Sequence, residues 1–132
     1  MNTIAQEFID QSISIVEKKN TPKIIKCLDQ LTEEQIWLRP NKASNSIGNI
    51  LLHLCGNITQ YVISALGDQP DIRERDKEFS AQGGYTKEEL LAKLTATLTQ
   101  AINVIRNIDE ARLMKIHSVQ GFNYSGIGSL FI

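Results

Sequence analysis

The sequence lacks the features that mark several classes of protein. It has two cysteines in 132 residues, and Cys27 and Cys55 form neither a CxxC pair nor a disulfide framework, so we expect both to be buried small side chains in a reduced protein. No apolar run approaches the roughly 20 residues of a transmembrane helix. The first residues, MNTIAQEFIDQ, carry acids and no basic side chain, which is unlike a secretory signal. These absences predict a cytoplasmic protein with no membrane partner.

An excess of charge of one sign is also missing. Fourteen lysines and arginines stand against fifteen aspartates and glutamates, and the formal net charge of −1 gives no overall attraction to nucleic acid. Apolar residues make up 42% of the chain and charged residues 22%, which are ordinary values for a globular protein. A chain of this length can bury a core without disulfides or a metal. We therefore expect one domain over residues 1–132 and no nucleic-acid partner.

The clearest pattern in the sequence is helical and lies in residues 46–66. This stretch begins on Ser46, a favoured N-cap residue, and stops at Gly67. Its apolar residues recur at helical spacing, so one face of the helix belongs in a core. They are Ile47, Ile50, Leu51, Leu54, Ile58, Tyr61, Val62 and Ala65.

Two further stretches carry a helical pattern. Residues 3–31 continue through Pro22, whose missing backbone donor predicts either a bend or a new helix start, and we favour one long helix bent near the proline. Residues 86–108 begin with a capping box of Thr86 and Glu89. Three long amphipathic helices without strand alternation predict an all-α bundle.

The remaining segments carry weaker patterns. Residues 32–37 predict a short helix in which Trp37 is a hydrophobic plug. Residues 114–124 are expected to be irregular or extended, with a turn at Gly121. Only a few residues follow, too few for a fourth long helix.

Residues 67–84 form the longest stretch without periodicity and include DQPDIRERDKEF. Its alternating charges predict a solvated loop with a short helix held by ion pairs. The alternative is that some of its charged side chains lie over the mouth of a site. Those side chains are Asp71, Arg73, Arg75 and Glu78.

Histidine is scarce, which limits the metal chemistry open to the chain. A transition-metal site needs three or four nitrogen, sulfur or carboxylate ligands, and no HxxxH or HExxH motif is present. His53 is at the flank of the apolar face of its helix and is either a metal ligand or a polar residue at the edge of the core. His117 is expected to face solvent or to support a ligand. The positions at helical spacing from His53 hold no strong ligand; they are Asn49, Gly56 and Asn57.

Five blocks of sequence, taken together and in order, resemble the DinB-like (damage-inducible) superfamily, and most closely an uncharacterised branch of it. The resemblance extends over essentially the whole chain and implies an up-down four-helix bundle that is often a homodimer. The blocks are LDQLTEEQIWLRPN at 28–41, NSIGNILLHLCGN at 45–57, PDIRERDKEF at 70–79, GGYTKEELLAKL at 83–94 and QGFNYS at 120–125.

The resemblance also implies a divalent metal, zinc or nickel, held by three histidines. One comes from the second helix, where His53 stands, and the other two form an HxxxH pair on the fourth helix. Relatives that are enzymes include thiol-dependent S-transferases, in which the metal activates a thiol or a water. This sequence ends before such a pair, and His117 matches neither of its positions. The resemblance therefore implies a bundle lacking most of its fourth helix, an incomplete metal site, and a small-thiol partner only if that site is completed.

A bundle without its fourth helix exposes an apolar groove, which we expect a homodimer or another partner to cover. Three functions follow from the sequence. The first is a metal-dependent thiol transferase or hydrolase whose C-terminal part is missing here. The second is a non-catalytic helical dimerisation module, with His53 at the edge of the core. The third is an inactive truncated product, and for all three the catalytic residues stay unknown.

Overall fold

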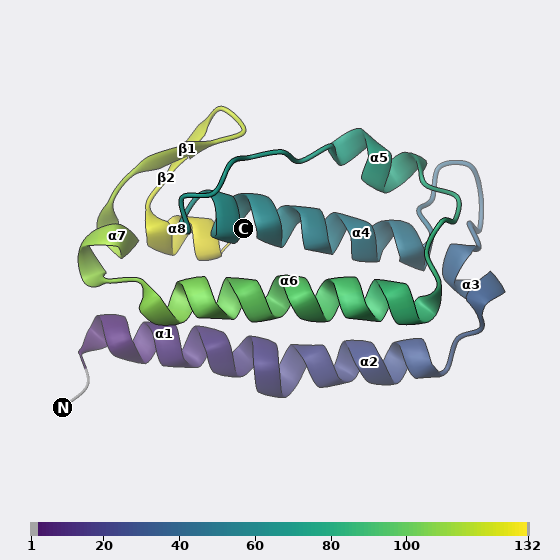
Figure 1. The fold of residues 1–132 in the computed structure, drawn as a ribbon, viewed down its shortest axis with the longest axis horizontal. Coiled ribbons are helices and arrows are strands. Elements are labelled where there is room, and N and C mark those ends of the chain that lie inside the picture. Colours follow the sequence, from purple (N-terminus) through teal and green to yellow (C-terminus); the bar gives the residue numbers. More distant parts are fainter. Residues whose placement is uncertain (1–2, 132) are drawn as a thin grey trace.

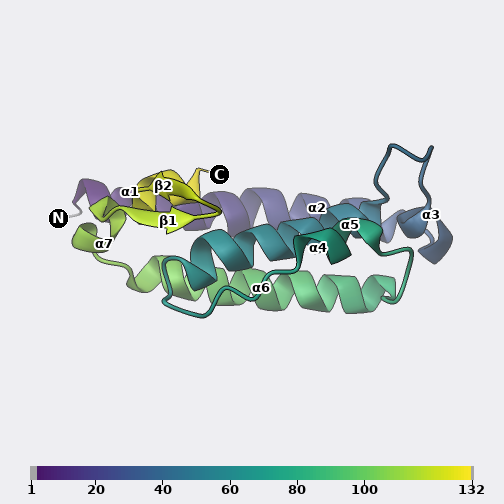
Figure 2. The ribbon, with the colours of Figure 1, turned by 90° about the horizontal axis from the view of Figure 1, so that it is seen from above.

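A computed structural model describes residues 3–131 and is mostly helical. Figures 1 and 2 show three long helical rods that lie side by side, with shorter elements at their ends and over one of them. This agrees with the predicted all-α class. A complete four-helix bundle stays a prediction.

The first rod runs without a break through the only proline in its sequence. α1 (Ile4–Ser14) continues through a wider π-helical stretch (Ile15–Asn20) into α2 (Thr21–Asp29). Pro22 lies in the first turn of α2, directly after the π-helical stretch. Such stretches accommodate a disturbed ladder of backbone hydrogen bonds inside a helix. The predicted long first helix is confirmed, with its irregularity next to Pro22.

The other two rods begin with capping boxes, which satisfy backbone donors that a helix start leaves free. Ser46 and Asn49 form the box of the second rod, and Thr86 and Glu89 form the box of the third. The rods are α4 (Ile47–Ile58) with its π-helical extension (Thr59–Ser64), and α6 (Lys87–Asn107). Along the chain, the short α3 (Glu33–Trp37) precedes the second rod, and α5 (Arg75–Ser80) follows the second rod and precedes the third.

α6 runs in the same direction as α4, and both run opposite to the first rod (Figure 1). The two buried clusters of the core follow this arrangement, because the starts of α4 and α6 share one cluster and their ends share the other. The chain between them, residues 67–86, returns along α4 and carries α5 on its way. The predicted up-down order is therefore wrong at this connection. The first cluster includes Leu51, Leu52, Leu90 and Leu94, and the second includes Val62, Ile63, Ala101 and Ile105.

The end of the chain folds back beside the first rod as α7 (Glu110–Met114), a hairpin and α8 (Gly126–Leu130). Strands β1 (His117–Val119) and β2 (Phe122–Tyr124) pair antiparallel, with Val119 opposite Phe122. Gln120 and Gly121 both have positive φ, 52° and 80°, as a two-residue turn of type I′ requires. The predicted extended stretch with a turn at Gly121 is confirmed.

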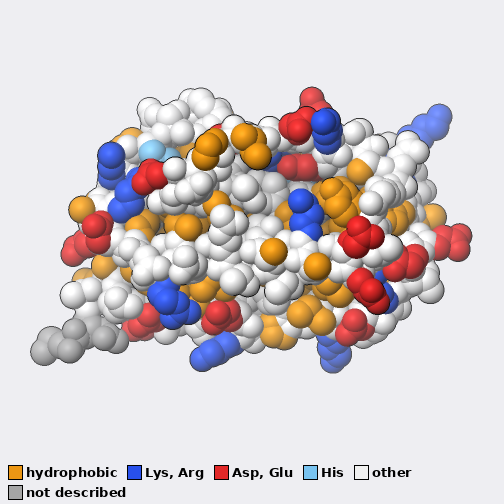
Figure 3. All heavy atoms as spheres, viewed as in Figure 1, with side chains coloured by type: hydrophobic (Ala, Val, Ile, Leu, Met, Phe, Trp, Pro, Cys, Tyr) orange, Lys and Arg blue, Asp and Glu red, His pale blue; other side chains and the backbone are white. Residues whose placement is uncertain are grey.

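The surface mixes both signs of charge. Figure 3 shows acidic and basic side chains interspersed over the face seen in Figure 1, with apolar side chains between them. Within residues 3–131, no helix has both the length and the apolar character that crossing a bilayer requires.

Candidate functional site

His53 lies on α4 beneath the short helix α5. Its side chain is 35% exposed, and its ring packs against Phe79 with 4.9 Å between the ring centroids. The sequence places this histidine at the flank of the apolar face, and the structure confirms it. The next point is which side chains of α5 and of the segment before it contact the His53 ring.

A buried asparagine fixes α5 on α4. The Asn49 side-chain amide donates to the backbone oxygens of Glu78 and Ala81, at 2.9 and 2.8 Å, and its oxygen accepts from Ser46. The Arg39 guanidinium donates to the backbone oxygens of Phe79 and Ala81. These bonds satisfy carbonyl groups that the end of a helix leaves free. The α5 segment is thus held in place by side chains that reach it from neighbouring elements.

A glycine on α4 lets one acidic side chain come close. A Cβ atom at Gly56 would lie 1.8 Å from Oε2 of Glu78 and 3.0 Å from Nε of Arg73. No side chain fits that space, so the glycine in the middle of this helix is explained by the approach of the carboxylate.

The carboxylate of Glu78 forms a bidentate ion pair with Arg73. Nε of Arg73 lies 3.0 Å from Oε2, Nη2 lies 2.9 Å from Oε1, and the two side chains are only 4% and 10% exposed. Nδ1 of His53 lies 3.2 Å from Oε1 of Glu78 and 3.0 Å from Nη2 of Arg73. The histidine is therefore the third member of a largely buried charged cluster.

Further polar side chains extend this cluster toward the hairpin. Oε1 of Gln60 accepts from Nη1 of Arg73 at 2.9 Å and from Nε2 of Gln120 at 2.6 Å. Nε2 of Gln60 donates to Oδ2 of Asp71 at 2.9 Å. We refer to the connected side chains as the His53 network: His53, Gln60, Asp71, Arg73, Glu78 and Gln120.

The contacts of Nδ1 determine whether the other ring nitrogen of His53, Nε2, carries a proton. If Nδ1 carries the proton, it donates to Glu78 and leaves Nε2 with a lone pair that can accept a proton or bind a metal. If Nδ1 accepts from Arg73, Nε2 carries the proton and can only donate. The distances fit both tautomers. Whether Nε2 of His53 can accept a proton therefore depends on whether Nδ1 bonds to Glu78 or to Arg73.

The described residues bring His53 no partner for a metal. Within residues 3–131, no three histidine, cysteine, aspartate or glutamate side chains converge as a metal centre requires. The nearest carboxylate, that of Glu78, has both oxygens bound by Arg73. Among the described residues, His53 is therefore the one side chain of this site with a ring nitrogen that could bind a metal.

His117 lies on β1, outside the His53 network. Both ring nitrogens are buried and have no hydrogen-bond partner among the described residues. This burial lowers the pKa of His117, and the positive charge of Arg112 lowers the pKa further. Of the two expectations for His117, facing solvent fails for the ring nitrogens, because both are buried in a residue that is otherwise partly exposed, and supporting a ligand stays a prediction.

Of the four charged residues predicted to lie over a site, three belong to the His53 network and one does not. Arg73 and Glu78 are buried side chains of the network, and Asp71 joins them through Gln60. Arg75 is not part of it and lies over the Phe79 ring, with Cζ 5.1 Å from the centroid. Most other residues of the segment are exposed, so the predicted solvated loop with a short helix and ion pairs is confirmed except at Arg73 and Glu78, whose side chains are buried.

Sequence reasoning placed Asn49 and Gln60 near His53 but missed their burial and their contacts, and it missed Gln120 entirely. Asn49 and Gln60 are buried polar residues on the second rod, and Gln120 reaches in from the hairpin turn. A signal was present for the first, because Asn49 stands at the third helical position after Ser46 and completes a capping box. Nothing local marks the contact of Gln60 with Gln120, which are sixty positions apart.

The two cysteines differ from each other in their surroundings. Cys55 is buried as predicted, and burial raises the pKa of its thiol. Cys27 is exposed on α2, so the prediction of a second buried cysteine is wrong.

The sequence model of the family described as "Protein of unknown function (DUF1572)" matches residues 3–128. No curated protein and no solved structure matches the chain significantly. Because the family match extends over nearly the whole sequence, the chain belongs to DUF1572, a family of unknown function.

Proposed function

We propose that this protein is a DinB-like helical bundle in which His53 stands at the position of the second-helix metal ligand. The order of its sequence blocks supports this proposal, as do the three helical rods. The contact of Nδ1 with a carboxylate supports it too, because metal-binding histidines commonly hold their second nitrogen in this way.

The described residues do not fit a complete zinc or nickel centre. A single imidazole provides one of the three or four ligands that such ions take from proteins. Arg73, whose Nη2 lies 3.0 Å from Nδ1 of His53, also brings a positive charge close to where a dication would bind. We therefore assign no metal-dependent step to these residues, and no thiol-transferase or hydrolase activity.

The function that the geometry supports best is that of a non-catalytic helical module that forms a homodimer. The observation that carries this proposal is an apolar groove of about 510 Å³ between α1, α4, α6 and α8. Exposed apolar side chains lie in it and near it, and burying one isoleucine is worth about 1.5–3 kcal/mol. A second copy is the partner we commit to, because the superfamily that the chain resembles is often homodimeric and a net charge of −1 favours neither a strongly acidic nor a strongly basic partner. The apolar groove is lined by Phe8, Ile15, Val16, Leu54, Ile58 and Ile102, among others.

Sedimentation velocity tests the homodimer. Ile15 lines the groove and is 44% exposed, so Ile15→Asp places a charge in the proposed interface without removing a buried side chain. Leu38→Asp is the matched control, because Leu38 is 62% exposed and lies outside the groove. We expect the parent chain and the control to be dimers and Ile15→Asp to be a monomer. A monomeric parent chain at micromolar concentration would refute the proposal.

Metal analysis tests the non-catalytic part of the proposal separately. After dialysis against zinc or nickel, we expect less than one metal ion per chain, with the same content in His53→Ala. A full equivalent of metal that is lost in His53→Ala would overturn this part and reveal a complete centre with ligands from a second copy or from outside residues 3–131.

A further inference from the structure

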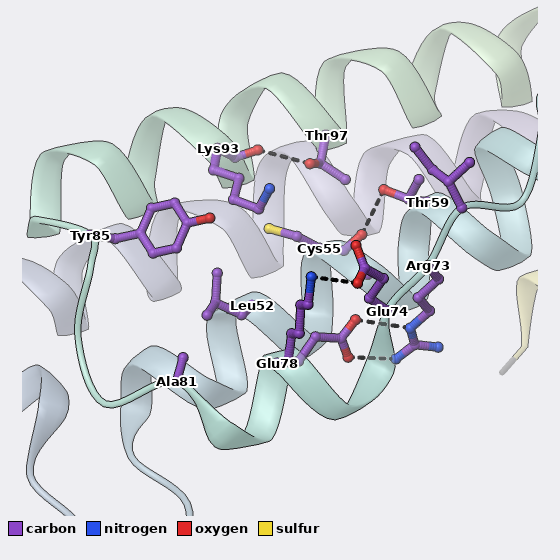
Figure 4. Close-up of a pocket in the computed structure, with 13 residues that line it drawn as sticks. Leu52, Cys55, Thr59, Arg73, Glu74, Glu78, Ala81, Tyr85, Lys93 and Thr97 are labelled. Atoms are coloured by element: carbon purple, nitrogen blue, oxygen red, sulfur yellow. Dashed lines mark hydrogen bonds and ion pairs between the residues drawn. The ribbon is translucent and has the colours of Figure 1, made fainter.

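A second cavity, unrelated to the apolar groove, lies between α4, α5 and α6 (Figure 4). Its volume is about 460 Å³, within the range of cavities that hold small molecules. Leu52, Cys55 and Gly56 of α4 form one wall, and Ile72 and Ala81 of the return segment form another. Most of these surfaces are apolar, so the body of a ligand here would be apolar as well.

The charges around the cavity do not cancel. Arg73 is paired with Glu78, and Nζ of Lys77 lies 2.6 Å from Oε2 of Glu74. The remaining charge is the ammonium group of Lys93 on α6, which has no carboxylate within 4.0 Å among the described residues. The cavity therefore carries one uncompensated positive charge.

The free hydrogen-bond donors lie at the same side of the cavity. In Figure 4 the Tyr85 hydroxyl points toward the sulfur of Cys55, and the end of the Lys93 side chain lies on the neighbouring side of that sulfur. The hydroxyls of Thr59 and Thr97 donate to the backbone oxygens of Cys55 and Lys93, at 2.7 and 2.8 Å, so their protons are already used. The donors available to a ligand are thus a lysine and a tyrosine that flank one point.

We propose that this cavity binds a small carboxylic acid with a short apolar body, in its carboxylate form. The ammonium group of Lys93 pairs with the carboxylate, the Tyr85 hydroxyl donates to it, and the apolar part contacts Leu52 and Ile72. An ammonium–carboxylate contact with an added hydroxyl donor is a charge-assisted arrangement, which is stronger than neutral hydrogen bonds. Burial raises the pKa of Cys55, so its thiol stays neutral and does not repel an anion.

Hexanoate is a suitable probe, and methyl NMR reports where it binds. We expect hexanoate to shift the methyl signals of Leu52 and Ile72 with a dissociation constant of about 1 mM, as befits a ligand of eight non-hydrogen atoms. Hexanamide has the same shape without the charge, and hexylammonium has the opposite charge. Both are expected to bind at least tenfold more weakly. Equal binding of hexanamide or stronger binding of hexylammonium would overturn the carboxylate assignment.

Variants at exposed lysines test the site itself. Lys93→Gln is expected to weaken hexanoate binding about tenfold, while Lys93→Arg keeps most of it. Lys23→Gln is the control, because it removes an exposed lysine of α2 that does not line the cavity. Unchanged affinity in Lys93→Gln, or no methyl shifts in the parent chain, would refute the proposal. Neither result bears on the homodimer, which is measured without a ligand.

Discussion

Removing Arg73 is the sharpest test of the His53 network. Its guanidinium makes two bonds to Glu78 and one to Gln60, and its side chain is 4% exposed. Arg73→Met keeps much of the length of the side chain and leaves the Glu78 carboxylate buried without its counter-charge. Breaking a buried pair in this way costs about 3–5 kcal/mol. That is a large part of the roughly 5–15 kcal/mol by which a native domain is stable.

Urea unfolding followed by circular dichroism measures this cost. A loss of about 3 kcal/mol lowers the urea midpoint by about 1–3 M, because the slope for small proteins is about 1–3 kcal/mol per M. The double variant Arg73→Met/Glu78→Leu removes both charges and is expected to recover most of the lost stability, since replacing a whole buried pair is often neutral. If Arg73→Met lowers the free energy of unfolding by less than about 1 kcal/mol, the pair contributes no more than a surface salt bridge, and the buried network is refuted.

Three further predictions concern other parts of the molecule. Gly56→Ala forces a methyl group against the Glu78 carboxylate, and we expect it to lower the free energy of unfolding by about 1–3 kcal/mol in urea despite alanine's better helix propensity; a stabilised variant would contradict the close approach. The folded-state pKa of His117 lies below its ordinary 6.5, so the unfolded chain binds more protons and stability falls as the pH drops below about 6.5; thermal melts should show a smaller loss in His117→Gln, and an equal loss would contradict its burial. With a thiol reagent, exposed Cys27 should react faster than Cys55, because burial leaves Cys55 only 3% exposed and raises the pKa of its thiol; equal rates for the two thiols would contradict this.

The long helices could be predicted from the sequence because their signals are local. Ser46 and Thr86 each start a helix by bonding to the residue three positions on, and the apolar spacing then continues through the whole rod. The direction of α6 relative to α4 could not be predicted in this way. It depends on the path of residues 67–86, and that path is fixed by bonds from Asn49 and Arg39, far away in the sequence.

The candidate site was only partly predictable for the same reason. His53 stands out as a lone histidine in an apolar helix, whereas the sequence offers Arg73 and Glu78 near a site only as the alternative to a solvated loop. Their burial was not expected, because alternating charges on a short segment usually remain solvated. Gly56 removes the side chain that would otherwise keep Glu78 away, and this effect appears only when α4 and α5 are placed together.

The parallel course of α4 and α6 has a consequence for how the chain reaches its fold. Leu52 and Leu94 share one buried cluster although they are about forty positions apart, whereas helices joined by a short turn meet through near neighbours in sequence. The chain must therefore close a long loop before these helices gain from packing together, and the entropy of that closure slows the search. We expect the pairing of α4 with α6 to be the late, rate-limiting event, and the ion pair on the return segment to form only after it.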